Sequence, residues 1–444
     1  MSSFFVENFG CRATQADGAA IERQLLDRGL ARSATAEGAE VVVLNTCTVT
    51  ASADQDARAA IRRIKRANPE AQIVVTGCYA QRAPEEISKL DGVSLVVGNS
   101  HKHALPELTA SLVSRAFVPL ASIVVSAAPV VIGDIFAHTE LMAAPVFDSE
   151  SAAERTRPNL KIQDGCNNRC SFCVIPYVRG KSRSLSLDAV LREVDALAEA
   201  GYKEIVLSGI NLGRWGNDLR PRMRFEELLR VILAKTGIPK IRISSVEPMD
   251  WSNELIAIVA ESPRVCKHAH VPLQSGSDRI LRQMHRRYRP WHYADRLQRL
   301  RAAMPSAAIG ADVMVGFPGE TDAHFEETRV FIKELPFTYL HVFTYSSRPG
   351  TPSATMAGQV PVHTARERNK VLRDLVAAKK QAFLLSLVGT ELEAVTLTVQ
   401  SAEHTEALTD NYQKLKLVGN HASNRMVRAR VEAVEGESLV GRLV

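Results

Sequence analysis

The sequence predicts an α/β protein with three parts: a small parallel α/β domain, a partial β/α barrel and a small all-β domain. Two observations lead to this prediction. As far as about residue 382, short β-branched runs alternate with helical patterns, which is typical of parallel sheets covered by helices. After residue 383 short strands follow one another with no helical pattern between them, which is typical of a small barrel.

The first predicted domain, residues 1–115, has a flavodoxin-like parallel sheet, because each of three short strands is followed by a helical pattern. Ser52 and Gln55 form a capping-box pattern, which predicts that a helix starts there after the second strand. The three strands are "FFVENF" (4–9), "VVVLNT" (41–46) and "QIVVTG" (72–77).

A linker is predicted for residues 116–151. Its apolar stretch "AFVPLASIVVSAAPVVIG" is interrupted by Pro119 and Pro129 and is rich in valine. This pattern favours short buried strands over a membrane-spanning helix, so we expect no membrane partner.

The second predicted domain, residues 152–382, is a full or partial β/α barrel, whose active site is expected at the C-terminal ends of its strands. One helix is predicted from its N-cap, Ser186, to Gly201, with Val190, Val194 and Leu197 on one face. Residues 383–444 form the third domain. The candidate barrel strands are 159–165, 204–210, 240–248, 267–273, 307–316 and 339–346.

Composition and charge set broad limits on function. The 444 residues carry a net charge of +6, which is compatible with a polyanionic partner but only mildly basic. The N-terminus has no basic segment before an apolar run, so we expect no signal peptide and a cytoplasmic protein. In that reducing compartment the clustered members of the seven cysteines are expected to bind metal rather than form disulfides.

Three cysteines lie in "DGCNNRCSFCVIP" with C-x₃-C-x₂-C spacing: Cys166, Cys170 and Cys173. A structural zinc site is the alternative interpretation, but it would need a fourth ligand nearby. An iron–sulfur cluster is favoured, because cysteine thiolates from a tight loop hold such clusters. With three cysteines, one iron of a four-iron cluster is left open for another ligand.

Three more cysteines, Cys11, Cys47 and Cys78, each follow one of the three N-terminal strands. Free cysteines are often simply buried, which is the alternative interpretation. However, the ends of parallel strands meet at one edge of a sheet, so the three thiols are expected to converge. A second cluster with a second open iron is therefore predicted.

The C-x₃-C-x₂-C motif after the first strand of a β/α series resembles the radical S-adenosylmethionine superfamily. The segments "NFGCRATQADG", "NTCTVT", "TGCYAQRAPEE", "HVPLQSGSDRILRQMHRRY", "ADVMVGFPGET" and "VFTYSSRPGTPSA" resemble its methylthiotransferase family along the whole chain. The C-terminal segment "ALTDNYQKLKLVG" is similar to the TRAM domain of the same enzymes.

The resemblance implies two [4Fe–4S] clusters, one on Cys166, Cys170 and Cys173 and an auxiliary one on Cys11, Cys47 and Cys78. It implies that one S-adenosylmethionine yields a 5′-deoxyadenosyl radical and that a second supplies the methyl group of the inserted methylthio group. An electron donor such as flavodoxin or ferredoxin is implied as well. Polar groups at the strand ends are candidate contacts to S-adenosylmethionine: Gly209, Ser245, Glu247 and Gln274.

Within this family "NTCTVT" resembles the branch that methylthiolates C2 of N6-threonylcarbamoyladenosine at position 37 of tRNA, in the anticodon stem-loop. N6-isopentenyladenosine 37 of tRNA and an aspartate of a ribosomal protein are the alternative substrates. A non-catalytic iron–sulfur RNA-binding protein is an alternative of another class.

An RNA partner is expected to contact arginines and aromatic side chains. Eight arginines lie between residues 279 and 301 with three aromatic residues among them, and three more lie close together in the C-terminal domain. The candidate RNA contacts are Arg286, Arg287, Tyr288, Arg425 and Arg428. Cys266 has no cysteine nearby and is predicted to be a buried thiol, and His268 and His270 are predicted to be packed or hydrogen-bonded rather than metal ligands.

Overall fold

The structure is a computed structural model that describes residues 2–113, 127–138, 141, 156–401 and 403–444. Most of the predicted linker, 116–151, and most of its apolar stretch lie outside the described residues. Within the described part, Val130–Val131 forms a short strand, β6. The chain divides into two compact units, which are described separately.

The first unit contains residues 1–145, 163–184 and 346–354, and the second contains 146–162, 185–345 and 355–444. The segment that carries the C-x₃-C-x₂-C motif therefore belongs to the same unit as the N-terminal sheet. The boundaries predicted at residues 115, 151 and 382 stay predictions.

The N-terminal sheet is parallel, with strand order β2-β1-β3-β4-β5-β6, which is the order of flavodoxin-like sheets and agrees with the predicted flavodoxin-like domain. The strands are β1 (Ser3–Asn8), β2 (Ala31–Arg32), β3 (Val41–Thr46), β4 (Gln72–Gly77), β5 (Val93–Gly98) and β6. The helices are α1 (Arg12–Asp27), α2 (Ala51–Ala67), α3 (Cys78–Arg82), α4 (Pro84–Ser88), η1 (Asn99–Ala104) and α5 (Leu105–Val113).

Helices cover both faces of this sheet, because β3 is apolar on both sides. Val42 and Leu44 pack with Ile61 of α2, whereas Val41 and Val43 pack with Ile21 of α1 on the opposite face. Alternate residues of a strand point to opposite faces, so a run of valines is buried only between two layers.

The start of α2 differs from the predicted capping box. The helix begins at Ala51, and its N-cap is Thr50, whose hydroxyl accepts a hydrogen bond from the Ala53 amide at 3.2 Å. Ser52 therefore lies inside the first turn, so the Ser52–Gln55 assignment was wrong. Thr50 has the extended backbone that an N-cap requires.

The predicted β/α series forms two partial sheets, most of whose strands belong to the second unit. Strands β7 (Asn159–Asp164), β8 (Arg183–Ser184), β9 (Glu204–Gly209) and β10 (Lys240–Ile243) have the order β10-β9-β7-β8. The unit boundary falls within β7, and β8 belongs to the first unit. Strands β11 (His268–His270), β12 (Ala308–Val315) and β13 (Tyr339–Thr344) form the other sheet. Parallel bridges from Ile241 to Val265 and from Ser245 to His270 connect the two, giving a partial barrel.

The helices of this series are α8 (Leu187–Glu199), η3 (Leu212–Arg214), α9 (Phe225–Lys235), η4 (Pro248–Asp250), α10 (Asn253–Glu261), α11 (Asp278–Gln283), α12 (Pro290–Ala303) and α13 (Asp322–Glu334). Helix α8 confirms its sequence prediction. Ser186 caps it, Gly201 follows it with a φ of +88°, and Val190, Val194 and Leu197 are its buried residues.

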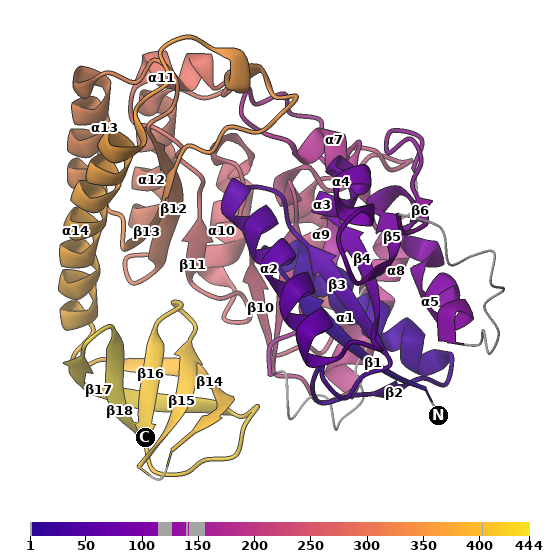
Figure 1. Ribbon diagram of the computed structural model, residues 1–444. Helices are drawn as coiled ribbons and strands as arrows, with labels where there is room; N and C mark the ends of the chain where they lie inside the picture. Colours follow the sequence, from indigo (N-terminus) through magenta and orange to yellow (C-terminus); the bar gives the residue numbers. More distant parts are fainter. Residues whose placement is uncertain (1, 114–126, 139–140, 142–155, 402) are drawn as a thin grey trace, which may run out of the picture. The chain divides into compact units, whose positions relative to one another are not determined.

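The C-terminal strands close into a small barrel with order β14-β15-β16-β18-β17, as the sequence predicts. They are β14 (Glu391–Gln400), β15 (His404–Thr409), β16 (Lys414–Val418), β17 (Met426–Glu435) and β18 (Ser438–Leu443). Helix α14 (Val362–Ser386) packs along β13 and leads into this barrel (Figure 1). Among the described residues, none of the helices combines the length and the apolarity needed to cross a membrane.

Candidate metal centre

The first cysteine trio converges at the carboxyl edge of the N-terminal sheet, as predicted. Cys47 and Cys78 directly follow Thr46 and Gly77, which are paired residues of β3 and β4. Cys11 follows β1, the other neighbour of β3. Gly10 has a φ of +97°, and a Cβ there would lie 2.6 Å from the Cβ of Cys47. Only glycine therefore lets the Cys11 loop approach Cys47 this closely.

The electrostatics of this trio favour a bound cation. Burial, together with the neighbouring thiols of Cys78 and Cys11, raises the pKa of Cys47 to about 12, against the opposing effect of Arg179. Three thiolates at this edge would repel one another without a positive centre. Metal ions remove this cost because they bind the deprotonated sulfur.

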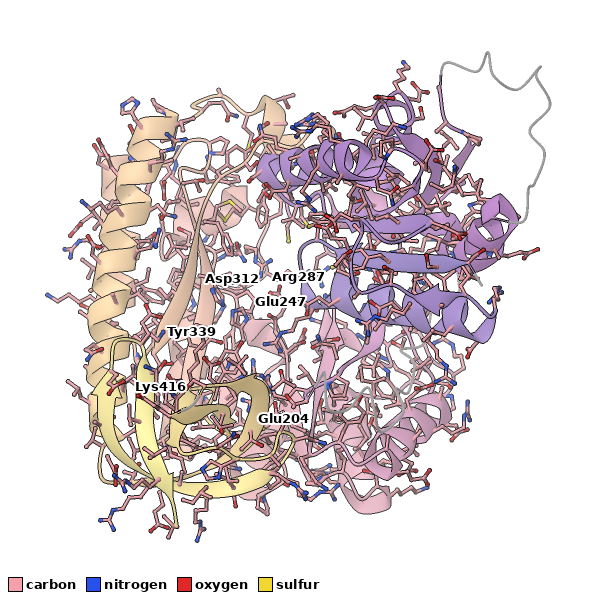
Figure 2. The ribbon with its side chains drawn as sticks, turned by 60° about the horizontal axis from the view of Figure 1, so that its bottom comes forward. Glu204, Glu247, Arg287, Asp312, Tyr339 and Lys416 are labelled. Atoms are coloured by element: carbon pink, nitrogen blue, oxygen red, sulfur yellow. The ribbon has the colours of Figure 1, made fainter. Side chains whose placement is uncertain are left out.

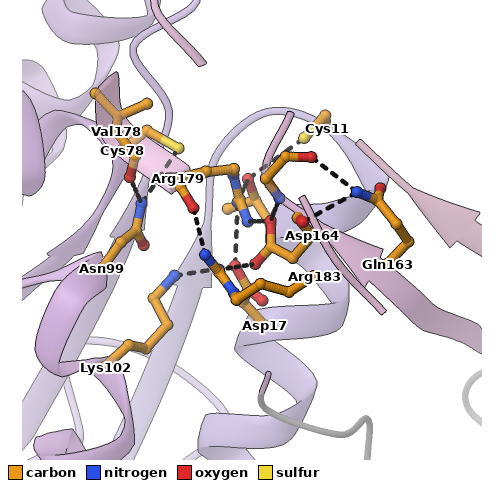
Figure 3. Close-up of polar contacts among 12 residues, drawn as sticks. Cys11, Asp17, Cys78, Asn99, Lys102, Gln163, Asp164, Val178, Arg179 and Arg183 are labelled. Atoms are coloured by element: carbon orange, nitrogen blue, oxygen red, sulfur yellow. Dashed lines mark hydrogen bonds and ion pairs between the residues drawn. The ribbon is translucent and has the colours of Figure 1, made fainter. Parts of the chain in front are cut away.

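Arg179 is the positive side chain that acts on Cys47, and it is almost fully buried, with 2% of its surface exposed. Its guanidinium forms ion pairs with Asp17 of α1 at 3.1 Å and with Asp164 at 3.0 Å (Figure 3). Lys102 of η1 reaches the same Asp17 carboxylate at 2.9 Å. Burial opposes the charge of Arg179, but the negative charges of Cys78, Asp164, Asp17 and Cys11 raise its pKa well above its usual value.

The second trio lies in the loop between the end of β7 and the helix α7 (Ile175–Arg179). Gly165 turns the chain into this loop with a φ of +70°, and a Cβ there would lie 2.0 Å from the carbonyl oxygen of Lys181. The Cys166 amide donates to the Gly180 oxygen at 3.1 Å, and the Cys173 amide donates to the Cys170 oxygen at 3.1 Å. All three cysteines are half-buried, so an exogenous ligand has access to them.

The helix that follows the second trio packs directly against the first trio. Cys78 forms a small apolar cluster with Val174 and Val178. The side-chain amide of Asn99 donates to the Val178 oxygen at 2.7 Å and lies 3.6 Å from the Cys78 sulfur (Figure 3). The two cysteine loops are thus held by shared contacts within one compact unit.

A third segment of this unit, residues 346–354, is fixed to the loop after Cys47. Arg348 forms an ion pair with Asp54, which also accepts from Arg82 at 2.8 Å. The Thr48 hydroxyl donates to Asp54 at 2.6 Å and accepts from Arg348 at 2.8 Å. The amide of Ser353 donates to the Ser171 oxygen at 2.9 Å, next to the second trio.

Sequence reasoning missed the buried charges around the cysteines. They are Asp17, Asp54, Lys102, Arg179 and Arg348. One signal was available for Asp17, which is four residues from both Ala13 and Ile21 and therefore lies on the apolar face of its helix. A charged residue at such a position needs a buried partner.

The residues predicted to contact S-adenosylmethionine lie at strand ends of the second unit. Gly209 is the last residue of β9. Ser245 shares a hydrogen bond of 2.7 Å with Nδ1 of His270, and Glu247 forms an ion pair with Arg286. Gln274 has a φ of +66°, and its backbone amide donates to the backbone oxygen of Asp312 at 2.8 Å. Their role toward a cofactor stays a prediction.

The candidate RNA contacts separate into buried and exposed residues. Tyr288 is 1% exposed, and its hydroxyl donates to the Leu273 oxygen at 2.7 Å. Arg286 is also buried and lies over the Tyr288 ring at 5.0 Å. In contrast, Arg287, Arg425 and Arg428 are exposed. Cys266 is buried, as predicted, and burial raises its pKa to about 12.

Comparisons with known proteins agree with this geometry. Residues 160–332 match the family model of the radical SAM superfamily, and residues 3–98 match "Uncharacterized protein family UPF0004". The chain is 37% identical to "Threonylcarbamoyladenosine tRNA methylthiotransferase MtaB" of Aquifex aeolicus, covering 96% of this chain and 99% of that protein. It is 34% identical to "tRNA-2-methylthio-N(6)-dimethylallyladenosine synthase" of Saccharopolyspora erythraea, covering 100% of this chain and 87% of that protein.

Among solved structures, the chain resembles the radical S-adenosylmethionine methyltransferase TsrM of Kitasatospora setae, with a TM-score of 0.57 and 18% identity. The match covers 80% of this chain and 77% of that chain. At this identity the likeness shows the fold.

Proposed function

Because this chain belongs to the radical S-adenosylmethionine tRNA methylthiotransferase family, we propose that it methylthiolates C2 of N6-threonylcarbamoyladenosine at position 37 of tRNA. It is an enzyme of the radical S-adenosylmethionine class, with S-adenosylmethionine and [4Fe–4S] clusters as its cofactors. The choice of nucleoside is supported by the relative from Aquifex aeolicus, which matches along nearly the full length of both chains. The "NTCTVT" segment supports the same choice.

The observation that carries the proposal is the presence of two incomplete cysteine trios in one compact unit. Cys11, Cys47 and Cys78 would hold the auxiliary cluster, and Cys166, Cys170 and Cys173 would hold the cluster that binds S-adenosylmethionine. The donor set fits, because cysteine thiolates hold iron–sulfur clusters, and these thiols come from one tight loop in the second trio and from three adjacent strand ends in the first. When bound, these cofactors supply radical activation of an inert C–H bond and the methylthio group.

The chain's own residues position the groups and exclude water. Cys47 and Cys78 are 6% and 2% exposed, so the auxiliary site is shielded on their side, whereas Cys11 is exposed and leaves the other side open. Arg179 supplies positive charge to this site, and Gly165 sets the path of the second loop. The proposed contacts to S-adenosylmethionine are Gly209, Ser245, Glu247 and Gln274.

For tRNA we propose contacts to the anticodon stem-loop through the exposed arginines Arg287, Arg425 and Arg428. In β17, Arg428 lies two residues from Arg430, so both point to the same face of the barrel. An electron donor such as a flavodoxin or ferredoxin completes the proposal, since the radical step consumes an electron.

Nucleoside analysis of tRNA tests the substrate. In a strain that lacks the protein, mass spectrometry should find N6-threonylcarbamoyladenosine without its 2-methylthio group. The wild-type chain should restore that group, and so should a Cys266→Ala variant as the matched cysteine control. Unchanged 2-methylthio-N6-threonylcarbamoyladenosine in the deletion strain would refute this substrate. Loss of the 2-methylthio-isopentenyl nucleoside, or of a modified ribosomal-protein aspartate, would indicate the alternative substrates.

Anaerobic reconstitution tests the division of labour between the trios. We expect about eight irons per chain, and about four in either Cys47→Ala or Cys170→Ala. Cys170→Ala should abolish release of 5′-deoxyadenosine, whereas Cys47→Ala should retain part of it and lose methylthiolation. Equal loss of both reactions in the two variants would contradict the assignment. About four irons and no cleavage in the wild type would favour a non-catalytic iron–sulfur protein.

A further inference from the structure

Three polar side chains meet on one face of the sheet formed by β11, β12 and β13. His270 of β11 pairs with Gly310 of β12, and Asp312, two residues further along β12, pairs with His341 of β13. Paired residues of parallel strands point to the same face, and so do residues two apart. The register therefore places His270, Asp312 and His341 side by side. Figure 2 shows Asp312 on this sheet, with Tyr339 of β13 also labelled.

The ligand atoms of these three residues are close together. Nε2 of His270 lies 3.4 Å from Oδ1 of Asp312, and the rings of His270 and His341 have centroids 5.7 Å apart. When one ligand atom is taken from each of the three residues, the three atoms all lie within 4.8 Å of one another. Ligands bound about 2.1 Å from one ion lie roughly 3 to 4 Å apart, so small side-chain rotations suffice.

His270 is oriented as a metal ligand. It is 92% buried, since 8% of its surface is exposed, and its Nδ1 is engaged by the Ser245 hydroxyl at 2.7 Å. Its Nε2 is buried without a hydrogen-bond partner in the described part of the chain, and it faces the Asp312 carboxylate. A histidine whose second nitrogen is fixed by a neighbour, with the first directed to a carboxylate, matches the support that metal-bound histidines receive.

The Tyr339 ring lies beside this group on the same face of the sheet. A Cβ on Gly310 would lie 2.0 Å from the Tyr339 ring, so glycine lets that ring lie against β12. Tyr339 is held there by a hydrogen bond of 2.7 Å between its hydroxyl and His268. The two histidines of "HAH" thus differ, because His268 serves packing whereas His270 carries the buried nitrogen that faces Asp312.

We propose that His270, Asp312 and His341 form a binding site for a divalent transition-metal ion, separate from the two cysteine trios. Two imidazoles and one carboxylate on one side of an ion suit Fe²⁺, Mn²⁺ or Zn²⁺ and leave other coordination positions open for oxygen ligands. Asp312 is partly exposed and His341 is exposed, so an ion can enter. The sequence prediction that His270 is packed or hydrogen-bonded is confirmed by its hydrogen bond with Ser245, and the proposal adds a metal ion at its other ring nitrogen.

Titration of the reconstituted holoenzyme with Mn²⁺ tests this site. The concentration of free Mn²⁺ is measured by electron paramagnetic resonance at each step, and the bound ion is the difference from the total. Manganese is a suitable probe because it prefers nitrogen and oxygen ligands, while the cluster sites are already filled. We expect about one bound ion per chain. Asp312→Asn and His341→Ala should remove this binding, whereas Ser245→Ala should weaken it roughly 10- to 100-fold. His363→Ala, at an exposed histidine of α14, is the matched control and should bind as the wild type does.

Elemental analysis after exposure to Zn²⁺ and dialysis provides the second measurement, with one equivalent expected in the wild type and none in His341→Ala. His341 is exposed, so its replacement leaves the core intact. Binding of neither ion by the wild type, or unchanged binding in both ligand variants, would overturn the proposal. Because the measured quantity is metal bound rather than tRNA modified, this outcome is independent of the proposed function.

Discussion

Replacing Arg179 with methionine should weaken the first unit and its auxiliary cysteine site. The guanidinium is 2% exposed and contacts two carboxylates, Asp17 and Asp164, which are themselves buried. Removing one partner of a buried ion pair leaves an uncompensated charge and typically costs about 3–5 kcal/mol. Asp17 keeps Lys102, and Asp164 keeps Arg183 at 3.6 Å, so we expect the lower part of this range, about 3 kcal/mol.

Hydrogen exchange and iron content measure this effect. In Arg179→Met the amides of α1 and α7 should exchange roughly 100-fold faster, which corresponds to about 3 kcal/mol of local stability. The reconstituted variant should retain fewer irons at the first trio, because the thiolates lose a compensating charge. Arg179→Lys keeps the charge but donates to fewer acceptors, so its exchange rates and iron content should lie between those of the wild type and Arg179→Met.

Arg63→Met provides the matched control for this experiment. Arg63 of α2 belongs to the same unit, but it is exposed and its ion pair is with Glu7 of β1 at 2.8 Å. Its loss should cost less than about 1 kcal/mol. If Arg179→Met had the same exchange rates and iron content as the wild type, the charge network would not support the cysteine site and the reasoning would be refuted.

Three further predictions concern other parts of the chain. Gly165→Ala should deplete iron at the second trio, measured by elemental analysis, because alanine is strained at a φ of +70° and its Cβ would meet the Lys181 oxygen. Gly201→Ala is the control for the strain alone, because its φ is +88° but a Cβ there meets nothing within 4 Å. Glu204→Gln should destabilise the second unit by about 3–5 kcal/mol in denaturant unfolding, since it leaves the buried Arg242 without its carboxylate. Burial opposes ionisation of Glu204, but Arg242 and Arg157 lower its pKa from 4.5 to about 2, so its contribution is complete above about pH 4.5 and is lost as the pH falls toward 2. A double Arg425→Ala, Arg428→Ala variant should weaken tRNA binding. The slope of log affinity against log salt concentration should fall by up to about two released counterions. Unchanged affinity and an unchanged slope would exclude Arg425 and Arg428 as tRNA contacts.

Local patterns were enough to predict much of the fold. The strands β3 and β4 have the predicted bounds, and α8 has the predicted cap and buried face. These elements are defined by short-range periodicity and capping, which are visible in one segment of chain. The convergence of Cys11, Cys47 and Cys78 was predictable for a related reason, because parallel strands place their C-terminal ends at one edge.

The interior of the site depends on contacts that no local pattern contains. Asp17, Lys102 and Arg179 come from α1, η1 and α7, and a charged residue in a sequence is ordinarily expected to face solvent. Tyr288 shows the same limit, because an aromatic residue among arginines suggests base stacking. In the structure the Tyr288 hydroxyl donates to the backbone oxygens of Pro272 and Leu273, and the ring is buried. Which side chains are buried depends on tertiary packing, and local sequence patterns do not reveal that packing.

The placement of the second cysteine loop shows why a division of the sequence into consecutive domains is incomplete. Residues 163–184 belong to the unit of the N-terminal sheet, although they begin the β/α series. They supply Val174 and Val178, which cover Cys78, and Arg179, which neutralises Asp17. A fragment limited to residues 1–115 would therefore expose the Cys78 thiol and remove the ion pair of Asp17 with Arg179. The auxiliary cysteine site is completed by the loop that carries the other three cysteines, so each site depends on the segment that builds the other.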